Sequence, residues 1–267
     1  MKRLVLFAIA CAAFAQNWQP TVVDAKFETR ASSGDLASQI RASSATWFGY
    51  AVKSKRHTGD NCCDRCRLEE SSGKSSTHPI PLEGSDVIAL LFRVENETIE
   101  KIQVHSLGCP LDAGGLPFVW LNGVSAAASE SFLKNLVTSN TSRHVGDSAI
   151  FAISQHDDPN AIPVLEDLAR PPQPAHLRGQ AIFWLAQEAG SRAASFIKGA
   201  IENDPDTEVK KKAVFALSQL PKDEGVPKLI QVAQENRNPE VRKQAFFWLG
   251  QSNDPRALAF IEQVLTR

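Results

Sequence analysis

The sequence predicts a small N-terminal α+β domain followed by an all-α superhelical solenoid of paired helices. Two observations carry this prediction. In the second half of the chain an apolar motif recurs every 32 residues, whereas the residues before about 125 show short strand-like runs and one helix-like segment. At 267 residues the chain is also long for one compact core, so a domain joined to a repeat array is expected.

The repeated motif is a seven-residue segment that aligns four times without a gap. Its copies, AIFAISQ, AIFWLAQ, AVFALSQ and AFFWLGQ, begin at Ala149, Ala181, Ala213 and Ala245, so each begins 32 residues after the one before. Apolar residues four before and four after each Ala complete a helical stripe, and the period leaves room for two helices. We therefore expect helices near residues 129–138, 145–155, 158–169, 175–187, 191–202, 206–219, 223–235, 239–250 and 255–266.

The segments around this motif carry a family resemblance. Asp206-Thr-Glu-Val-Lys210 and Asn238-Pro-Glu-Val-Arg242, each followed by x-x-Ala-x-x-x-Leu, resemble the second helix of HEAT repeats. Gly225-Val-Pro-Lys-Leu229 resembles the first helix. The resemblance implies HEAT-like repeats over residues 126–267, with the second helices along a concave face that binds another protein or a peptide.

Cations recur at the same interval, at Arg178, Lys210 and Arg242, and Asp204 or Asn236 stands in the preceding turn. In HEAT proteins such pairs resemble ladders that bond neighbouring loops. The competing interpretation is that these charges are simply solvated.

Each copy of the motif also carries a Phe and a Gln that turn away from the apolar stripe. At 100° per residue they fall at about 200° and 240° from the Ala, whereas the stripe lies within about 40° of it. Two interpretations stay open: a binding ladder along the concave face, or packing of each Phe between repeats with the glutamines bonding helix ends. The alternation of Ala152, Trp184, Ala216 and Trp248 predicts large-small interdigitation between successive repeats. The ladder residues are Phe151, Phe183, Phe215 and Phe247 with Gln155, Gln187, Gln219 and Gln251.

The predicted α+β domain spans residues 16–125. Strands are expected at Val22 to Thr29 and at Trp47 to Lys53, with a helix between them around residues 34–45. Asp86 to Val94 and Thr98 to His105 are expected to form a hairpin with its turn at residues 95–97. The Gly-Gly-Leu-Pro run at residues 114–117 is expected to break the chain before a last apolar segment.

The first fifteen residues are typical of a secretory signal peptide. Lys2 and Arg3 precede an apolar run that ends in the small-residue site Ala13-Phe14-Ala15, so the mature chain is expected to begin at Gln16 and to be periplasmic or secreted. A lipid anchor at Cys11 is the alternative. Without this segment 27 basic residues stand against 30 acidic ones, which disfavours nucleic acid as a partner. No later run is apolar enough to span a membrane.

Four cysteines remain in the expected mature chain: Cys62, Cys63, Cys66 and Cys109. In an exported protein they are expected to form disulfides, with one bond from Cys62 or Cys63 to Cys109 tying down a polar loop. Cys63 and Cys66 also form a CxxC motif, which could exchange disulfides or bind zinc. Because the motif lies in a polar loop and lacks a second close pair, neither a metal site nor a cofactor is expected.

No catalytic motif is present. Gly-x-Ser-x-Gly and His-Glu-x-x-His are absent from the sequence, and His105, His144, His156 and His176 share no spacing, so they are interpreted as surface or capping residues. The expected function is a non-catalytic, exported protein-binding or scaffold protein, with its apolar last helix, Arg256 to Leu265, as a homodimer contact. Two alternatives remain: a redox or metal-dependent accessory factor using the Cys62 to Cys66 loop, or a lyase-associated module, because some short bacterial HEAT arrays resemble phycobilin lyase subunits.

Overall fold

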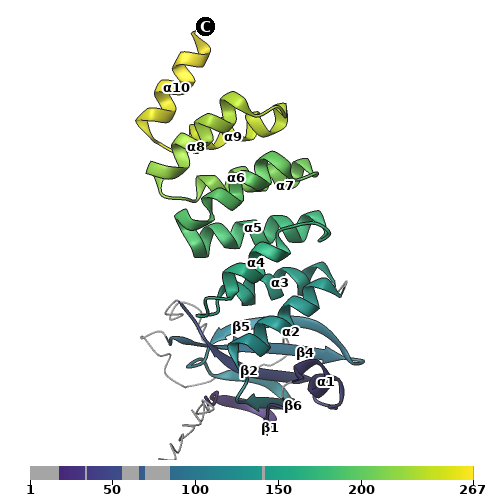
Figure 1. Cartoon of the computed structure of the whole chain (residues 1–267). Helices are drawn as coiled ribbons and strands as arrows, with labels where there is room; N and C mark the ends of the chain where they lie inside the picture. The colour runs from purple at the N-terminus through teal and green to yellow at the C-terminus, as the bar shows by residue number, and fades with distance from the viewer. Residues whose placement is uncertain (1–17, 34, 56–65, 70–84, 140–141, 267) are drawn as a thin grey trace, which may run out of the picture.

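The computed structural model describes residues 18–33, 35–55, 66–69, 85–139 and 142–266. These residues form a mixed β-sheet followed by a stack of helices, so the predicted fold class is confirmed (Figure 1). The sheet lies at one end of an elongated molecule, and the C-terminal helix lies at the other end. The predicted signal peptide, with Cys11, lies outside the described residues.

The described part of the sheet has six strands in the order β1-β6-β2-β4-β5, with β3 paired to β6 off this path. Strand β1 runs parallel to β6, and β6 runs parallel to β2, whereas β4 is antiparallel to both β2 and β5. The bounds are β1 Val22–Ala31, β2 Trp47–Lys53, β3 Cys66–Arg67, β4 Val87–Glu95, β5 Thr98–Ser106 and β6 Leu111–Asn122, with helix α1 at Leu36–Arg41 between β1 and β2.

Two predictions about the sheet, the hairpin turn and the break at residues 114–117, have different outcomes. The predicted hairpin of β4 and β5 is confirmed, and its turn is made by Asn96 and Glu97, which both have positive φ and so match the right-handed twist of the strands. The expected break at residues 114–117 is wrong. Strand β6 continues through it, because Gly114 and Gly115 adopt positive φ and form an irregularity opposite β1 without ending the pairing.

The helical array begins at Ala126, and each repeat contains a first helix followed by a second helix. The predicted helices lie within a few residues of the observed ones, because the apolar period and the Asp, Asn and Pro caps both encode the ends. The bounds are α2 Ala126–Thr138, α3 Arg143–Ser154, α4 Ala161–Leu168, α5 Ala175–Ala189, η2 Gly190–Ala193, α6 Ala194–Asn203, α7 Thr207–Ser218, α8 Lys222–Glu235, α9 Pro239–Gln251 and α10 Pro255–Leu265.

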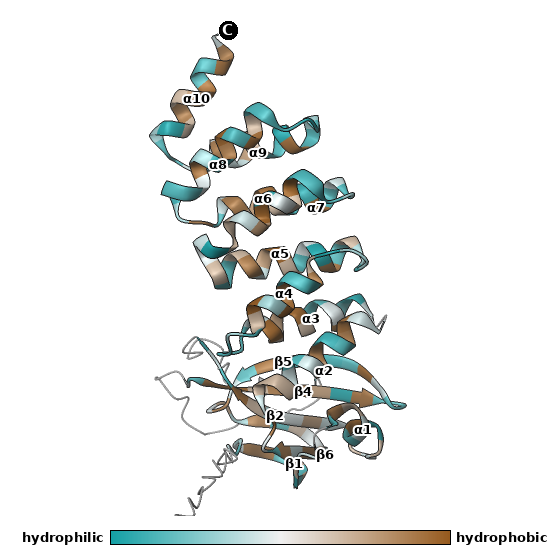
Figure 2. Cartoon of the chain, viewed as in Figure 1, coloured by the Kyte–Doolittle hydropathy of each residue, from teal (hydrophilic) through white to brown (hydrophobic). Residues whose placement is uncertain are grey.

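One face of the sheet is buried by the first helices of the array. The ring of Tyr50 in β2 stacks on that of Phe92 in β4, with 5.4 Å between the ring centroids. The Phe92 ring also meets the edge of Phe132 in α2, with a centroid distance of 5.4 Å. From there a single apolar core continues through every helix pair, so the sheet caps the array (Figure 2). The other face has its own core, in which Trp120 donates a hydrogen bond from its indole nitrogen to the carbonyl of Trp18.

None of the helices in the described ranges has the length and apolar character required to cross a membrane.

Candidate functional site

A continuous row of six aromatic rings runs across the second helices α3, α5, α7 and α9. The 32-residue period places a Phe at the same point of each helix, and a Trp follows it in α5 and α9. Neighbouring ring centroids lie 4.7 to 5.8 Å apart. In order, the row consists of Phe151, Trp184, Phe183, Phe215, Trp248 and Phe247.

Both tryptophans pack between successive repeats, as the large-small alternation predicts. Trp184 contacts Phe151 of the preceding repeat at 4.8 Å, and Trp248 contacts Phe215 at 4.7 Å. Each of them also meets the Phe of its own helix at 5.0 Å. The small alanines at the equivalent positions of α3 and α7 are fully buried. Both tryptophans are also half-buried, so they belong to the partly exposed row, which the large-small alternation did not predict.

The row is partly exposed along its whole length. Phe247 is 54% exposed, and the other five rings are half-buried. Phe151, Phe183 and Phe215 thus pack against rings of neighbouring repeats and still present part of each ring to solvent. The packing interpretation is confirmed for these three residues, and binding by the ladder stays a prediction. Adjacent packed helices are about 10 Å apart, which gives four helices a span of about 30 Å.

The aromatic row lies on the side of the array where the second helices pack. Neighbouring second helices pack directly on one another, α3 on α5, α5 on α7 and α7 on α9. Neighbouring first helices are instead separated by surface grooves, between α2 and α4, α4 and α6, and α6 and α8. We call this second-helix side the inner face of the array.

The four glutamines do not form a uniform ladder. Gln155 is buried and donates to the Ser154 hydroxyl at 2.9 Å, so its predicted outward position is wrong. Gln219 is exposed and donates to the Ser218 hydroxyl at 3.1 Å. Both are C-cap residues of their helices. Gln187 is half-buried and Gln251 is exposed.

One polar atom within the row is unsatisfied. The indole nitrogen of Trp248 is buried and finds no hydrogen-bond acceptor among the described residues. Leaving a buried donor unpaired costs about 1–3 kcal/mol, and such groups are rare in native structures. Packing alone therefore does not account for a Trp at position 248, because its indole nitrogen is buried without an acceptor.

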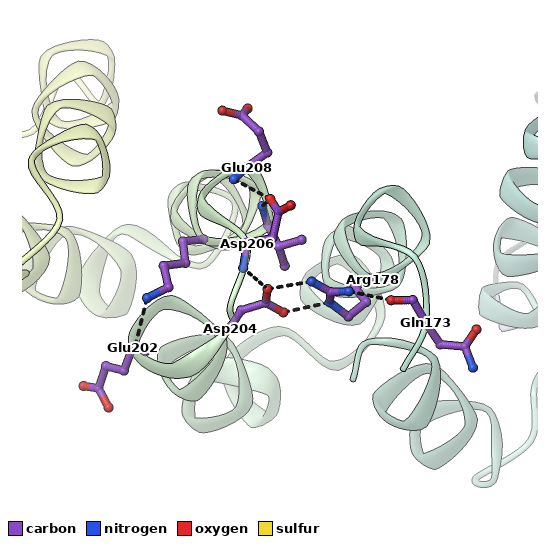
Figure 3. A network of polar contacts seen from close by, with 8 residues as sticks. Gln173, Arg178, Glu202, Asp204, Asp206 and Glu208 are labelled. Atoms are coloured by element: carbon purple, nitrogen blue, oxygen red, sulfur yellow. Dashed lines mark hydrogen bonds and ion pairs between the residues drawn. The ribbon is translucent and has the colours of Figure 1, made fainter. Parts of the chain in front are cut away.

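The predicted charge ladder is complete at one rung (Figure 3). The Arg178 guanidinium of α5 binds the Asp204 carboxylate of the next repeat through two hydrogen bonds, 2.8 and 2.7 Å, and both side chains are buried. Asp204 also accepts the backbone N–H of Asp206 at 2.9 Å, which orders the loop before α7. The Asp204 carboxylate raises the pKa of Arg178.

The other two rungs differ from the prediction. Lys210 donates to the backbone carbonyl of Glu202 at 3.1 Å, and Arg242 donates to the backbone carbonyl of Asn236 at 2.7 Å. Asn236 stands 32 residues after Asp204, so Lys210 has an amide where Arg178 has a carboxylate. Neither Lys210 nor Arg242 pairs with a carboxylate among the described residues.

A buried polar chain joins the sheet to the array. Ser129 Oγ of α2 lies 2.8 Å from Tyr50 Oη of β2 and 2.8 Å from His156 Nε2, and His156 Nδ1 lies 2.8 Å from the carbonyl of Ala152. A carbonyl only accepts, so Nδ1 carries the proton, Nε2 accepts from Ser129, and Ser129 accepts from Tyr50. Burial lowers the pKa of His156 to about 4, which keeps the imidazole neutral.

This Ser–His pair was not expected from the sequence. His156 is not a surface residue, but it does cap α3, because its Nδ1 bonds the last-turn carbonyl of Ala152. Ser129 and His156 are both fully buried, so no substrate reaches the hydroxyl. The pair therefore fixes the junction between sheet and helices. His144 is exposed, and His105 and His176 are half-buried.

Of the predicted disulfide cysteines, Cys109 is fully buried and disulfide-bonded. The backbone of Cys66 lies in β3, where it pairs with Leu111 of β6. Cys62 and Cys63 lie outside the described residues, so the pairing of either with Cys109 stays a prediction. Across the described ranges no group of three or more His, Cys, Asp or Glu is arranged to hold a metal ion.

Comparison with known proteins finds a family model that is similar to part of the chain. The family model of HEAT repeats matches residues 193–267, and no curated protein sequence matches the chain. The complex of CpcE and CpcF of phycocyanin lyase from Nostoc sp. PCC7120 is similar at a TM-score of 0.42 and 18% identity, over 53% of this chain and 91% of that chain. Human deoxyhypusine hydroxylase is similar at a TM-score of 0.32 and 17% identity, over 52% of this chain and 57% of its own. The match to the HEAT-repeat model covers helices α6 to α10.

Proposed function

We propose that this protein is an exported, non-catalytic binding protein that holds another protein against the inner face of its helical array. The observation that carries the proposal is the six-ring aromatic row. Exposed contiguous apolar surface on a folded protein is characteristic of interaction sites. Large aromatic side chains also supply a disproportionate share of binding energy at such sites.

The surroundings of the row suit a protein partner. Glutamine and serine side chains line one side of it, at the C-terminal ends of α7 and α9. Lys211 and Lys243 stand on the other side, where Lys211 is paired with Glu208 at 2.9 Å. An apolar centre with a polar and charged rim is the usual anatomy of a protein interface.

Two further features support the export and non-catalytic parts of the proposal. The disulfide at Cys109 suits an oxidising compartment, in agreement with the signal-like start of the sequence. The described pair in which a nucleophile meets a base, Ser129 and His156, is sealed in the interior. Export is tested by expressing the full chain and sequencing the N-terminus of the product: a start at Gln16 supports it, and retention of Met1 contradicts it.

Binding is tested by affinity capture of envelope and secreted proteins with three variants. Phe183→Ser with Phe215→Ser removes the centre of the row, and Phe247→Ser removes its exposed end with little effect on packing. Leu258→Ser with Val264→Ser removes two exposed apolar side chains of α10 and serves as the matched control. The proposal expects a partner that the wild type and the control retain, that the double Phe variant loses and that Phe247→Ser binds more weakly.

Melting curves and circular dichroism of each variant separate lost binding from lost folding. If the row variants fold and keep every partner, the inner face is not the binding site. Loss of the partner in the α10 control alone would place the interface at the end of the array.

A further inference from the structure

A groove of about 400 Å³ lies on the first-helix side of the array, between α6 and α8. Its floor is apolar and its rim is charged, with more cations than anions. A cavity of this volume is within the range of small-molecule sites. The floor includes Ile201, Leu217 and Val232, and the rim carries Lys198, Lys210, Lys228 and Arg237 against Glu202 and Glu235.

Asn236, which lines this groove, occupies the repeat position that the acid Asp204 has one repeat earlier. Lys210 and Asn236 stand 32 residues after Arg178 and Asp204, at the same positions of the next repeat. Arg178 is neutralised by the Asp204 carboxylate at 2.7 Å. Lys210 makes its described hydrogen bond to a neutral carbonyl, that of Glu202, at 3.1 Å. Two of the three donors of its ammonium group are left for another acceptor.

Arg237 adds a second cation without a carboxylate. It lines the groove and is exposed, and its guanidinium makes no ion pair with any described residue. Of the two acids on the rim, Glu202 lies 3.8 Å from Lys198, and Glu235 accepts a hydrogen bond from Gln231 at 2.9 Å and keeps its negative charge. Four rim cations stand against these two acids. The rim is therefore positive where Lys210 and Arg237 stand.

The equivalent grooves of the other repeats are neutralised. In the groove between α2 and α4, Lys134 pairs with Asp167 at 2.5 Å. In the groove between α4 and α6, Arg170 lies 3.8 Å from the Glu166 carboxylate, and its guanidinium lies 4.7 Å from the ring centre of Phe196. The groove between α6 and α8 thus differs from the other two grooves, because Lys210 and Arg237 on its rim have no carboxylate partner among the described residues.

We propose that the groove between α6 and α8 binds a small amphipathic carboxylate, with the acid at Lys210 and Arg237 and the apolar body on Ile201, Leu217 and Val232. The ligand carboxylate takes the role that Asp204 has one repeat earlier. A charge-assisted hydrogen bond to an ammonium or guanidinium favours an ionised acid over a neutral polar group. The site lies on the other side of the array from the aromatic row and does not depend on it.

Isothermal titration calorimetry of the full chain with octanoate tests this proposal, with octanol and octylammonium as probes of matched length. The proposal expects octanoate to bind more tightly than either. Lys210→Met with Arg237→Gln keeps the apolar stems and removes the charges, and should weaken octanoate by about tenfold or more, the equivalent of losing one charged contact. Lys26→Met, an exposed cation on β1, is the matched control and should leave affinity unchanged.

The outcomes that overturn the proposal are equally concrete. Failure of octanoate to bind the wild type, equal binding of octanol, or equal affinity of the double variant for octanoate would each contradict it. The variant with Phe183→Ser and Phe215→Ser should bind octanoate as the wild type does, so failure of the groove and failure of the protein-binding face are distinguishable.

Discussion

Phe183 of α5 and Phe215 of α7 stack with their ring centroids 5.8 Å apart and their planes 3° from parallel. The two residues are one repeat apart, so the same helical position on two packed helices presents the same side chain in the same orientation. Because helix packing holds these rings in place before any partner arrives, little conformational entropy is lost on binding. The inner face is a preorganised surface.

The buried ion pair of Arg178 and Asp204 should make a large contribution to folding stability. Arg178→Met leaves the Asp204 carboxylate buried without its partner and should lower the free energy of unfolding by about 3–5 kcal/mol. Lys210→Met removes a partly exposed cation bonded to a carbonyl, and should cost about 1 kcal/mol or less. Denaturant unfolding of both variants measures the difference.

A double variant tests the cause of that loss. Arg178→Met with Asp204→Asn removes the unpaired charge and should recover part of the stability that Arg178→Met alone loses. Equal losses in the free energy of unfolding for Arg178→Met and Lys210→Met would show that the Arg178–Asp204 ion pair adds no more stability than a solvated charge.

Stability should fall in mild acid because of His156. Burial lowers its pKa from 6.5 to about 4, so below pH 6.5 the unfolded state takes up a proton that the folded state does not. The stabilisation from the neutral imidazole is complete above about pH 6.5 and decreases as the pH falls toward 4, by about 3 kcal/mol in total.

The comparison that isolates this effect is the pH dependence of unfolding in wild type and in His156→Gln. Burial raises the pKa of Glu130, a change whose contribution to stability has the opposite sign, and it is common to both proteins. His156→Gln should be less stable than the wild type at neutral pH, and its free energy of unfolding should change less between pH 6.5 and 4. Parallel curves would mean that His156 is not held neutral in the interior.

Tyr50 offers a direct optical test of the junction between sheet and array. It is the single tyrosine of the chain, it is fully buried, and burial raises its pKa above the ordinary value of 10. Ultraviolet titration should therefore show no tyrosinate at about pH 10 while the chain is folded, and full ionisation at that pH in denaturant. Half-ionisation near pH 10 in the folded protein would place Tyr50 in contact with solvent.

Much of the fold could be predicted because its information is local. The segment predicted as a helix at 206–219 is α7, Thr207–Ser218, and the strand Trp47–Lys53 was predicted with its observed bounds. In both cases the apolar period and the cap or turn residues stand next to one another in the sequence. At Gly114 the same local reasoning failed, because whether a glycine with positive φ ends a strand depends on the partner strand β1.

The candidate site was predicted in part for the same reason. The period identified the Phe positions, and the large-small alternation predicted Trp184 between repeats. The alternation could not show that Trp184 also reaches the surface beside Phe151 of the preceding repeat. Ser129 and His156 are 27 residues apart on different elements and meet because α2 and α3 pack on the sheet. No signal in the sequence pairs them.

The most direct test of binding at the inner face is site-specific photocrosslinking. The photoreactive residue p-benzoylphenylalanine replaces Phe247 in one variant and Leu258 in another, two positions of nearly equal exposure, 54% and 55%. Phe247 lies in the aromatic row and Leu258 on α10. We expect covalent adducts with a partner protein from position 247 and none from position 258. Adducts from position 258 with none from position 247 would contradict the account.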